Sequence, residues 1–279
     1  PEGPRRPYAV AEKEIRYATS GRDLLPARSV YGDCPGSNFA EMFYVLVPDP
    51  TGTINGNVRT KSFVNDVVVS TIAHEFQHLI NASRRMYIND AVRVDEELWL
   101  NEGLSHIAEE LVFYRASGAS PRGNIQGSQL GLGTPMRFAL DTYNRPNLAR
   151  YYQYLKATEG NSPLAADDGL GTRGASWAFL RYLADRTRPT DGDLWRRLVN
   201  SNATGTANLD RVLVGTGLTT LAALRDWSVC VIADDNPATS STTAQQPSWN
   251  FVTALPALGN GLSFALAPRV LQSGTNTPF

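Results

Sequence analysis

Hydrophobic and polar positions in the first third of the chain predict a strand followed by a helix. The segment "EMFYVLVPDP" (41–50) is a continuous run of β-favouring apolar residues that stops at two prolines, so we expect a strand covered on at least one face. The segment "VVVSTIAHEFQHLI" contains neither glycine nor proline and follows polar residues that suit a helix cap. It predicts a helix from Asn65 or Asp66 to about Ala82.

Helical patterns continue through most of the remaining chain. The segment "DAVRVDEELWLNEGLSHIAEELVFYRASG" predicts a second helix that begins between Glu96 and Trp99 and ends by Gly118. A Gly-, Ser- and Pro-rich stretch then indicates a lobe boundary or a flexible loop, and a segment of low complexity near the end precedes a tail that can form one or two short strands. We therefore expect four parts, in chain order: 1–116 with both helices, the connection 117–135, a mainly helical lobe over 136–235, and a flexible segment with an irregular or β tail over 236–279.

Composition and charge narrow the class of protein. The chain has 279 residues, of which 42% are hydrophobic and 19% charged, and its formal net charge is -1, as in ordinary globular proteins. No block of lysine or arginine marks a surface for nucleic acid or for an anionic membrane. The sequence contains no run of 18 apolar residues, so it does not predict insertion into a membrane. We expect an exported protein whose signal or propeptide is absent from this sequence; Cys34 and Cys230 fit either one long-range disulfide or two buried thiols.

Two of the three histidines stand four residues apart in the first helix. His74 and His78 lie one turn above each other on one helical face, so their imidazoles can converge on a single ion. Glu75 points to the flank of that face, where its carboxylate can reach a metal-bound water without ligating the metal. This H-E-x-x-H arrangement is typical of zinc hydrolases, although the same pattern also arises by chance on surface helices.

A catalytic zinc needs a third protein ligand and an open fourth position. The continuation H-x-x-G-x-x-H is excluded, because Asn81 and Arg84 occupy the glycine and histidine positions. Asp90 and Asp95 remain alternatives in the polar connection, where a solvated loop is their ordinary role. Glu102, 24 residues after His78, is preferred, because an antiparallel return helix can bring it beside the pair and its apolar neighbours argue against a solvated charge.

The two motifs "HEFQH" and "WLNEGLSHIAEEL" together resemble the gluzincin zinc metallopeptidases, and most resemble the hyicolysin-type secreted metallopeptidases. The resemblance covers about residues 40–115, and the helical remainder only loosely. It implies an α+β, zincin-like fold with a small N-terminal sheet and two active-site helices, followed by a mainly helical lobe. It also implies one catalytic zinc on His74, His78 and Glu102, with Glu75 as general base, in a secreted endopeptidase that cleaves protein or peptide substrates.

Two other functions stay open beside this one. The large aminopeptidases share W-L-N-E-G and the same ligand set, but their G-A-M-E-N segment is absent from this chain. The chain also fits a binding or cell-surface module whose metalloprotease-like site is structural or degenerate.

The supporting residues of the site are less defined by the sequence. Several gluzincins have an aspartate one turn after the ligand glutamate; here His106 stands at that position, so it is expected to hydrogen-bond a ligand, contact substrate or replace Glu102, or else to be an ordinary packed histidine. Asp167-Asp168 and Asp234-Asp235 suit surface capping better than calcium binding. The candidates for stabilising the oxyanion are Tyr143, Tyr151, Tyr152, Tyr154, Tyr182 and Arg173.

Overall fold

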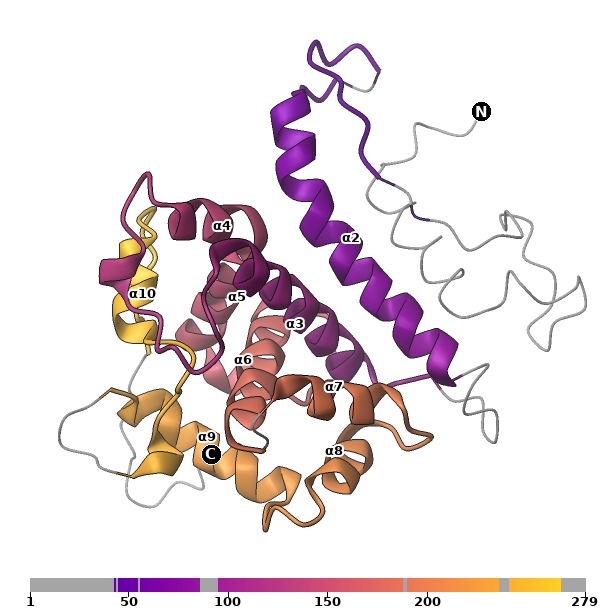
Figure 1. Cartoon of the computed structure of the whole chain (residues 1–279), viewed down its shortest axis with the longest axis vertical. Coiled ribbons are helices and arrows are strands. Elements are labelled where there is room, and N and C mark those ends of the chain that lie inside the picture. The colour runs from indigo at the N-terminus through magenta and orange to yellow at the C-terminus, as the bar shows by residue number, and fades with distance from the viewer. Residues whose placement is uncertain are drawn as a thin grey trace, which may run out of the picture.

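The described part of the computed structural model is helical (Figure 1). It comprises residues 43, 45–54, 56–85, 95–187, 190–235 and 241–266. Within these ranges the β-structure is limited to two isolated bridges, Asp49–Arg59 and Ile125–Trp249. The prediction of an α+β fold with a small N-terminal sheet is therefore wrong for the part of the chain that the structure describes.

The predicted strand at 41–47 has no ladder in its described residues. Val45 and Val47 are exposed, and the segment that follows is closed by the single pair of hydrogen bonds between Asp49 and Arg59. Pro48 and Pro50 have no N–H groups to donate to a neighbouring strand. A β-favouring composition without a partner strand leaves the backbone irregular.

The first predicted helix is present as α2 (Lys61–Ser83) and begins a few residues earlier than expected. Thr60 is its N-cap, and the Thr60 hydroxyl accepts a hydrogen bond from the backbone N–H of Phe63 at 3.1 Å. Figure 1 shows α2 along one side of the helical body, next to α3.

The second predicted helix is confirmed as α3 (Leu98–Ser117). It ends where Gly118 takes the left-handed conformation, φ 71°, and donates its backbone N–H to Tyr114 O. α3 packs against α2 on one side and against α4 and α6 on others, so most of its side chains are buried. The helix that carries Glu102 is therefore central to the fold.

In the described ranges, six further helices lie between α3 and the tail. The helices before the tail are α4 (Pro135–Tyr143), α5 (Arg145–Lys156), α6 (Leu170–Thr187), α7 (Asp191–Val199), α8 (Gly205–Leu213) and α9 (Thr220–Ala233). One cluster of buried apolar side chains runs from α3 to the tail, with Trp177, Trp227 and Trp249 among its largest members. The division of the chain at 117–135 stays a prediction.

The tail differs from its prediction. Residues expected to form short strands contain α10 (Phe251–Ala257), which the Asn250 side chain caps by accepting from Thr253 N. The described residues of the stretch expected to be mobile (236–248) are hydrogen-bonded to the helical body. Arg186 donates to Thr242 O at 2.8 Å, and Gln246 N donates to Asp234 at 2.7 Å.

Two remaining expectations concern the cysteines and the membrane. Cys230 is buried in α9, whereas Cys34 lies outside the described residues, so the pairing of the two stays untested. None of the helices in the described ranges has the length and apolar character that crossing a membrane requires.

Glycines allow the helices around α3 to pack closely. A Cβ at Gly174 of α6 would overlap the backbone of Arg150 and Tyr151 in α5. A Cβ at Gly103 of α3 would lie 2.7 Å from Leu180 Cδ1 of α6. These close approaches bring Glu102 and Arg173, the neighbours of the two glycines, to the junction of α3 with α6.

Candidate metal centre

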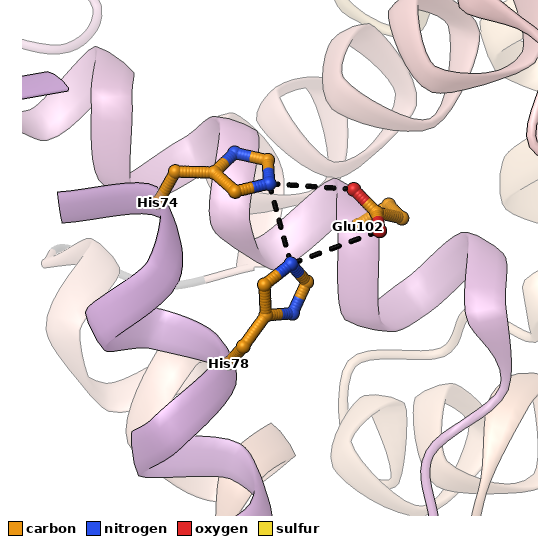
Figure 2. A group of neighbouring side chains, drawn as sticks. All are labelled: His74, His78 and Glu102. Carbon is orange, nitrogen blue, oxygen red and sulfur yellow. Dashed lines mark hydrogen bonds and ion pairs between the residues drawn. The ribbon is translucent and has the colours of Figure 1, made fainter. Parts of the chain in front are cut away.

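Helices α2 and α3 bring His74, His78 and Glu102 together (Figure 2). His74 Nε2 lies 3.2 Å from His78 Nε2 and 3.4 Å from Glu102 Oε2, and His78 Nε2 lies 3.7 Å from Glu102 Oε1. The potential ligand atoms of the three residues all lie within 4.8 Å of one another. The two imidazoles thus point across the helix junction at one carboxylate.

The outer nitrogens of both rings face oxygen atoms. His74 Nδ1 lies 2.8 Å from Glu109 Oε1, and His78 Nδ1 lies 3.2 Å from Ser105 Oγ. When each Nδ1 holds the proton of its neutral ring, both Nε2 lone pairs are directed toward Glu102. Two lone pairs and a carboxylate that face one another form a donor set suited to a cation, so these residues fit a zinc ion.

The pKa values of the two rings move in opposite directions. Burial alone lowers the pKa of His74, but hydrogen bonds to Glu102 and Glu109 outweigh it and raise the pKa to about 9. Burial and the charge of His74 lower the pKa of His78 to about 4. Burial opposes ionisation of Glu102, but the hydrogen bond from His74 and nearby positive charges hold the pKa of Glu102 well below its ordinary value. Without a metal, the His74 ring is therefore positively charged and the His78 ring neutral, beside the ionised carboxylate of Glu102.

Glu75, the predicted general base, follows His74 on α2, and its side chain is half-buried. Asp95, one of the alternative ligands, is exposed, and Asp90 lies outside the described residues. Of the third-ligand candidates that the structure describes, Glu102 is the one grouped with both histidines.

His106 is fully buried on α3, behind the ring of His74. The centroids of the two rings are 4.8 Å apart, and His106 Nδ1 lies 3.4 Å from Glu109 Oε1. Burial lowers the pKa of His106 to about 3, so the ring is neutral. Asn147 Nδ2 donates to the His106 carbonyl, which ties this turn of α3 to α5.

Glu109 is the neighbour of His74 that the sequence analysis missed. The available signal was its position seven residues after Glu102, which places both carboxylates on the same face of α3. Glu109 is also grouped with His74 and His106 as a potential second metal site. Arg150 already supplies a cation there, because its Nη1 lies 3.6 Å from Glu109 Oε2 and 3.5 Å from His106 Nδ1.

Among the candidates for stabilising the oxyanion of the reaction, Arg173 is the one that contacts the group formed by His74, His78 and Glu102. Its Nη1 lies 2.9 Å from Glu102 Oε2. Tyr151 and Tyr154 stack on each other in the core, Tyr182 donates to Thr243 O, and Tyr143 and Tyr152 pack against the core. Packing therefore accounts for the tyrosines.

The paired aspartates have protein partners. Asp167 accepts from Gly169 N and Thr172 Oγ1 at the start of α6, and Asp168 pairs with Arg173. Asp234 accepts from Gln246 N. Asp167 therefore caps a helix as expected, whereas Asp234 is buried rather than on the surface.

A buried polar chain fixes α2 against α3 beyond the donor set. Asn81 Nδ2 donates to Asn101 Oδ1 at 2.8 Å, and Arg85 Nε donates to Asn81 Oδ1 at 3.0 Å. Arg85 also pairs with Glu96, which accepts from the backbone N–H of Gly205 at 2.7 Å. The ends of the two helices that carry the ligands are thereby joined to the start of α8.

Comparison with known proteins gives a partial match. No protein-family model matches the chain. The neutral metalloprotease ShpI of Staphylococcus hyicus is 33% identical to it over 84 residues, which are 30% of this chain and 18% of that protein. The chain is thus distantly similar to a metalloprotease over part of its length.

Proposed function

We propose that the protein is a zinc-dependent metalloendopeptidase of the gluzincin type. The observation that carries the proposal is the convergence of two Nε2 atoms and one carboxylate, from two neighbouring helices, within 4.8 Å. The similarity to a neutral metalloprotease supports the same class of reaction. The resemblance to secreted metallopeptidases further supports an exported protein.

In this proposal, His74, His78 and Glu102 hold the zinc ion and leave its fourth position open. Zinc, when bound, acts as a Lewis acid that polarises the peptide carbonyl and acidifies water. Glu75 takes the proton from the attacking water and then delivers it to the leaving amine. Glu109 keeps the His74 proton on Nδ1 through the 2.8 Å contact, so that Nε2 stays a ligand.

The supporting roles follow from burial and contacts. His106 is neutral and fully buried, so its proposed part is to pack behind His74 and hold Glu109. Catalysis by direct contact of His106 with substrate is disfavoured by that burial. Arg173 lies beside Glu102, where its charge also favours an anionic transition state.

Metal analysis combined with one conservative variant tests the proposal. The purified chain should bind about one zinc per molecule, the stoichiometry of a three-ligand catalytic site. It should cleave an N-blocked peptide and lose that activity when the metal is chelated. Glu75→Gln should retain zinc but lose turnover, because the amide cannot accept the proton.

Each alternative gives a different result. An aminopeptidase would cleave free-amine peptides and spare N-blocked ones. A non-catalytic module would bind zinc without turnover in the wild type. Undiminished cleavage after complete removal of the metal would refute the proposal itself.

A further inference from the structure

Arg173 bridges the donor set and an exposed carboxylate. Its Nη1 lies 2.9 Å from Glu102 Oε2, while its Nη2 and Nε lie 2.6 and 2.7 Å from Asp168 Oδ1. The Arg173 side chain is 12% exposed, and that of Asp168 is 39% exposed. One edge of the guanidinium therefore pairs with the surface carboxylate of Asp168, and another edge pairs with the buried carboxylate of Glu102.

The backbone around Arg173 fixes where this guanidinium lies. Asp167 caps the start of α6 through Gly169 N and Thr172 Oγ1. Gly174 lets the next turn of α6 pack directly against the backbone of α5. Arg173 thus sits between two fixed points of the chain, in contrast to an arginine on a free surface.

The contact has a consequence for how Glu102 binds a metal. A carboxylate ligates zinc through one or both oxygens, and two-oxygen binding needs a lone pair from each. Arg173 Nη1 forms an ion pair with Oε2 at 2.9 Å, and a dication that bound Oε2 as well would meet the positive charge of the guanidinium. Both oxygens face the rings, since Oε1 lies 3.7 Å from His78 Nε2 and Oε2 lies 3.4 Å from His74 Nε2. The two oxygens differ in that Arg173 pairs with Oε2.

We propose that Arg173, oriented by Asp168, is a positioning residue that limits Glu102 to one-oxygen coordination and so keeps the fourth zinc position open. This proposal rests on the proposed zinc site. It concerns the geometry of the ligand Glu102 and can fail while zinc binding itself is confirmed.

The test compares zinc-loaded crystal structures and cobalt-substituted spectra of the full chain and its variants. In the wild type, one oxygen of Glu102 should lie at a bonding distance of about 2.0–2.2 Å from the metal. In Arg173→Met both oxygens should lie at a bonding distance, the second one at the fourth position that is open to water in the wild type. The cobalt spectrum should change, because a carboxylate oxygen replaces water as the fourth ligand. Asp168→Asn should shift the spectrum in the same direction. It is the second variant in case Arg173→Met does not fold, since the Asp168 side chain is 39% exposed and its replacement leaves the core unchanged.

Arg196→Met is the matched control, because Arg196 is 70% exposed and pairs with Asp193 on α7. Its spectrum should equal that of the wild type. One-oxygen binding and an unchanged spectrum in Asp168→Asn, or in folded Arg173→Met, would overturn the positioning role. Absence of metal binding by the wild type would instead overturn the proposed function.

Discussion

His74 Nδ1 lies 2.8 Å from Glu109 Oε1, and Glu109 stands two helical turns after Glu102 on α3. One helix face thereby offers both a carboxylate that points at His74 Nε2 and another that holds His74 Nδ1. Burial opposes the charge of Glu109, but His106 and His74 hold its pKa well below the ordinary value. Ionised carboxylates therefore lie next to both nitrogens of the His74 ring, Glu102 at Nε2 and Glu109 at Nδ1.

Glu109→Gln should weaken zinc binding by roughly 10–100-fold, the usual effect of removing an outer partner of a metal-bound histidine. The amide keeps the size of the side chain but loses the charge that orients the ring of His74. Competition with a chelator measures the affinity. Glu159→Gln is the control, because Glu159 is exposed on a 3-10 turn. A folded Glu109→Gln protein with wild-type affinity would contradict the role of Glu109.

The sequence predicted the three grouped residues because helical spacing determines most of their relationship. His74 and His78 share a face of α2 by periodicity alone, and the length of the connection allows α3 to return beside them. Helical spacing does not predict which of the two residues Glu109 and Glu110 lies next to His74. They are adjacent acids in "AEEL", yet Glu109 faces His74 and Glu110 faces Trp249. Only the packing of α3 between other helices decides which acid meets which partner.

The β predictions failed for a related reason. Val45 and Val47 belong to a β-favouring run but have no ladder partner among the described residues, and Phe251 begins a helix that Asn250 caps. Strand formation depends on a partner that is distant in the sequence, whereas helices α2 and α3 satisfy their backbone groups locally. Local patterns therefore predicted helices better than strands in this chain.

Arg85→Met should destabilise the fold by roughly 3–5 kcal/mol, because it leaves the charge of Glu96 buried without its cation. Arg85 is 1% exposed and connects Glu96, Asn81 and the carbonyl of Ala203. Denaturant unfolding in the presence of a chelator measures the loss. Arg196→Met should leave stability nearly unchanged, because exposed ion pairs contribute little. Equal stability of both variants would show that the buried pair has no net effect.

Gly174→Ala should destabilise the protein by about 1–3 kcal/mol or more, the range for overpacking in a dense interior. The new methyl group would overlap the backbone of Arg150 and Tyr151, which cannot rotate away. Gly103→Ala should cost less, since its closest neighbour is the end of the Leu180 side chain. The midpoints of chemical unfolding rank the two variants. The opposite order would contradict the close packing of α5 and α6 described above.

Glu110→Gln should change how stability depends on pH. Burial raises the pKa of Glu110 to about 7, even though Arg181 and the hydrogen bond from Trp249 favour its charged form. A carboxyl whose pKa is raised on folding binds more protons in the folded state than in the unfolded state. Its contribution to the free energy of unfolding therefore falls as the pH rises from the ordinary value of 4.5 to about 7, and is constant on either side.

The neutral amide at position 110 removes this contribution without removing the acceptor for Trp249. The free energy of unfolding of Glu110→Gln, minus that of the wild type, should accordingly increase between about pH 4.5 and 7. A pH-independent loss of stability from the altered contact with Arg181 would change this difference by the same amount at every pH and would leave its slope unchanged. Unfolding in urea at several pH values, with a chelator present so that metal binding adds no pH dependence, measures the difference. Glu159→Gln should follow the wild type at every pH. A difference that stays flat for Glu110→Gln would mean that Glu110 is already ionised in the folded protein, and that Arg181 outweighs the cost of burying it.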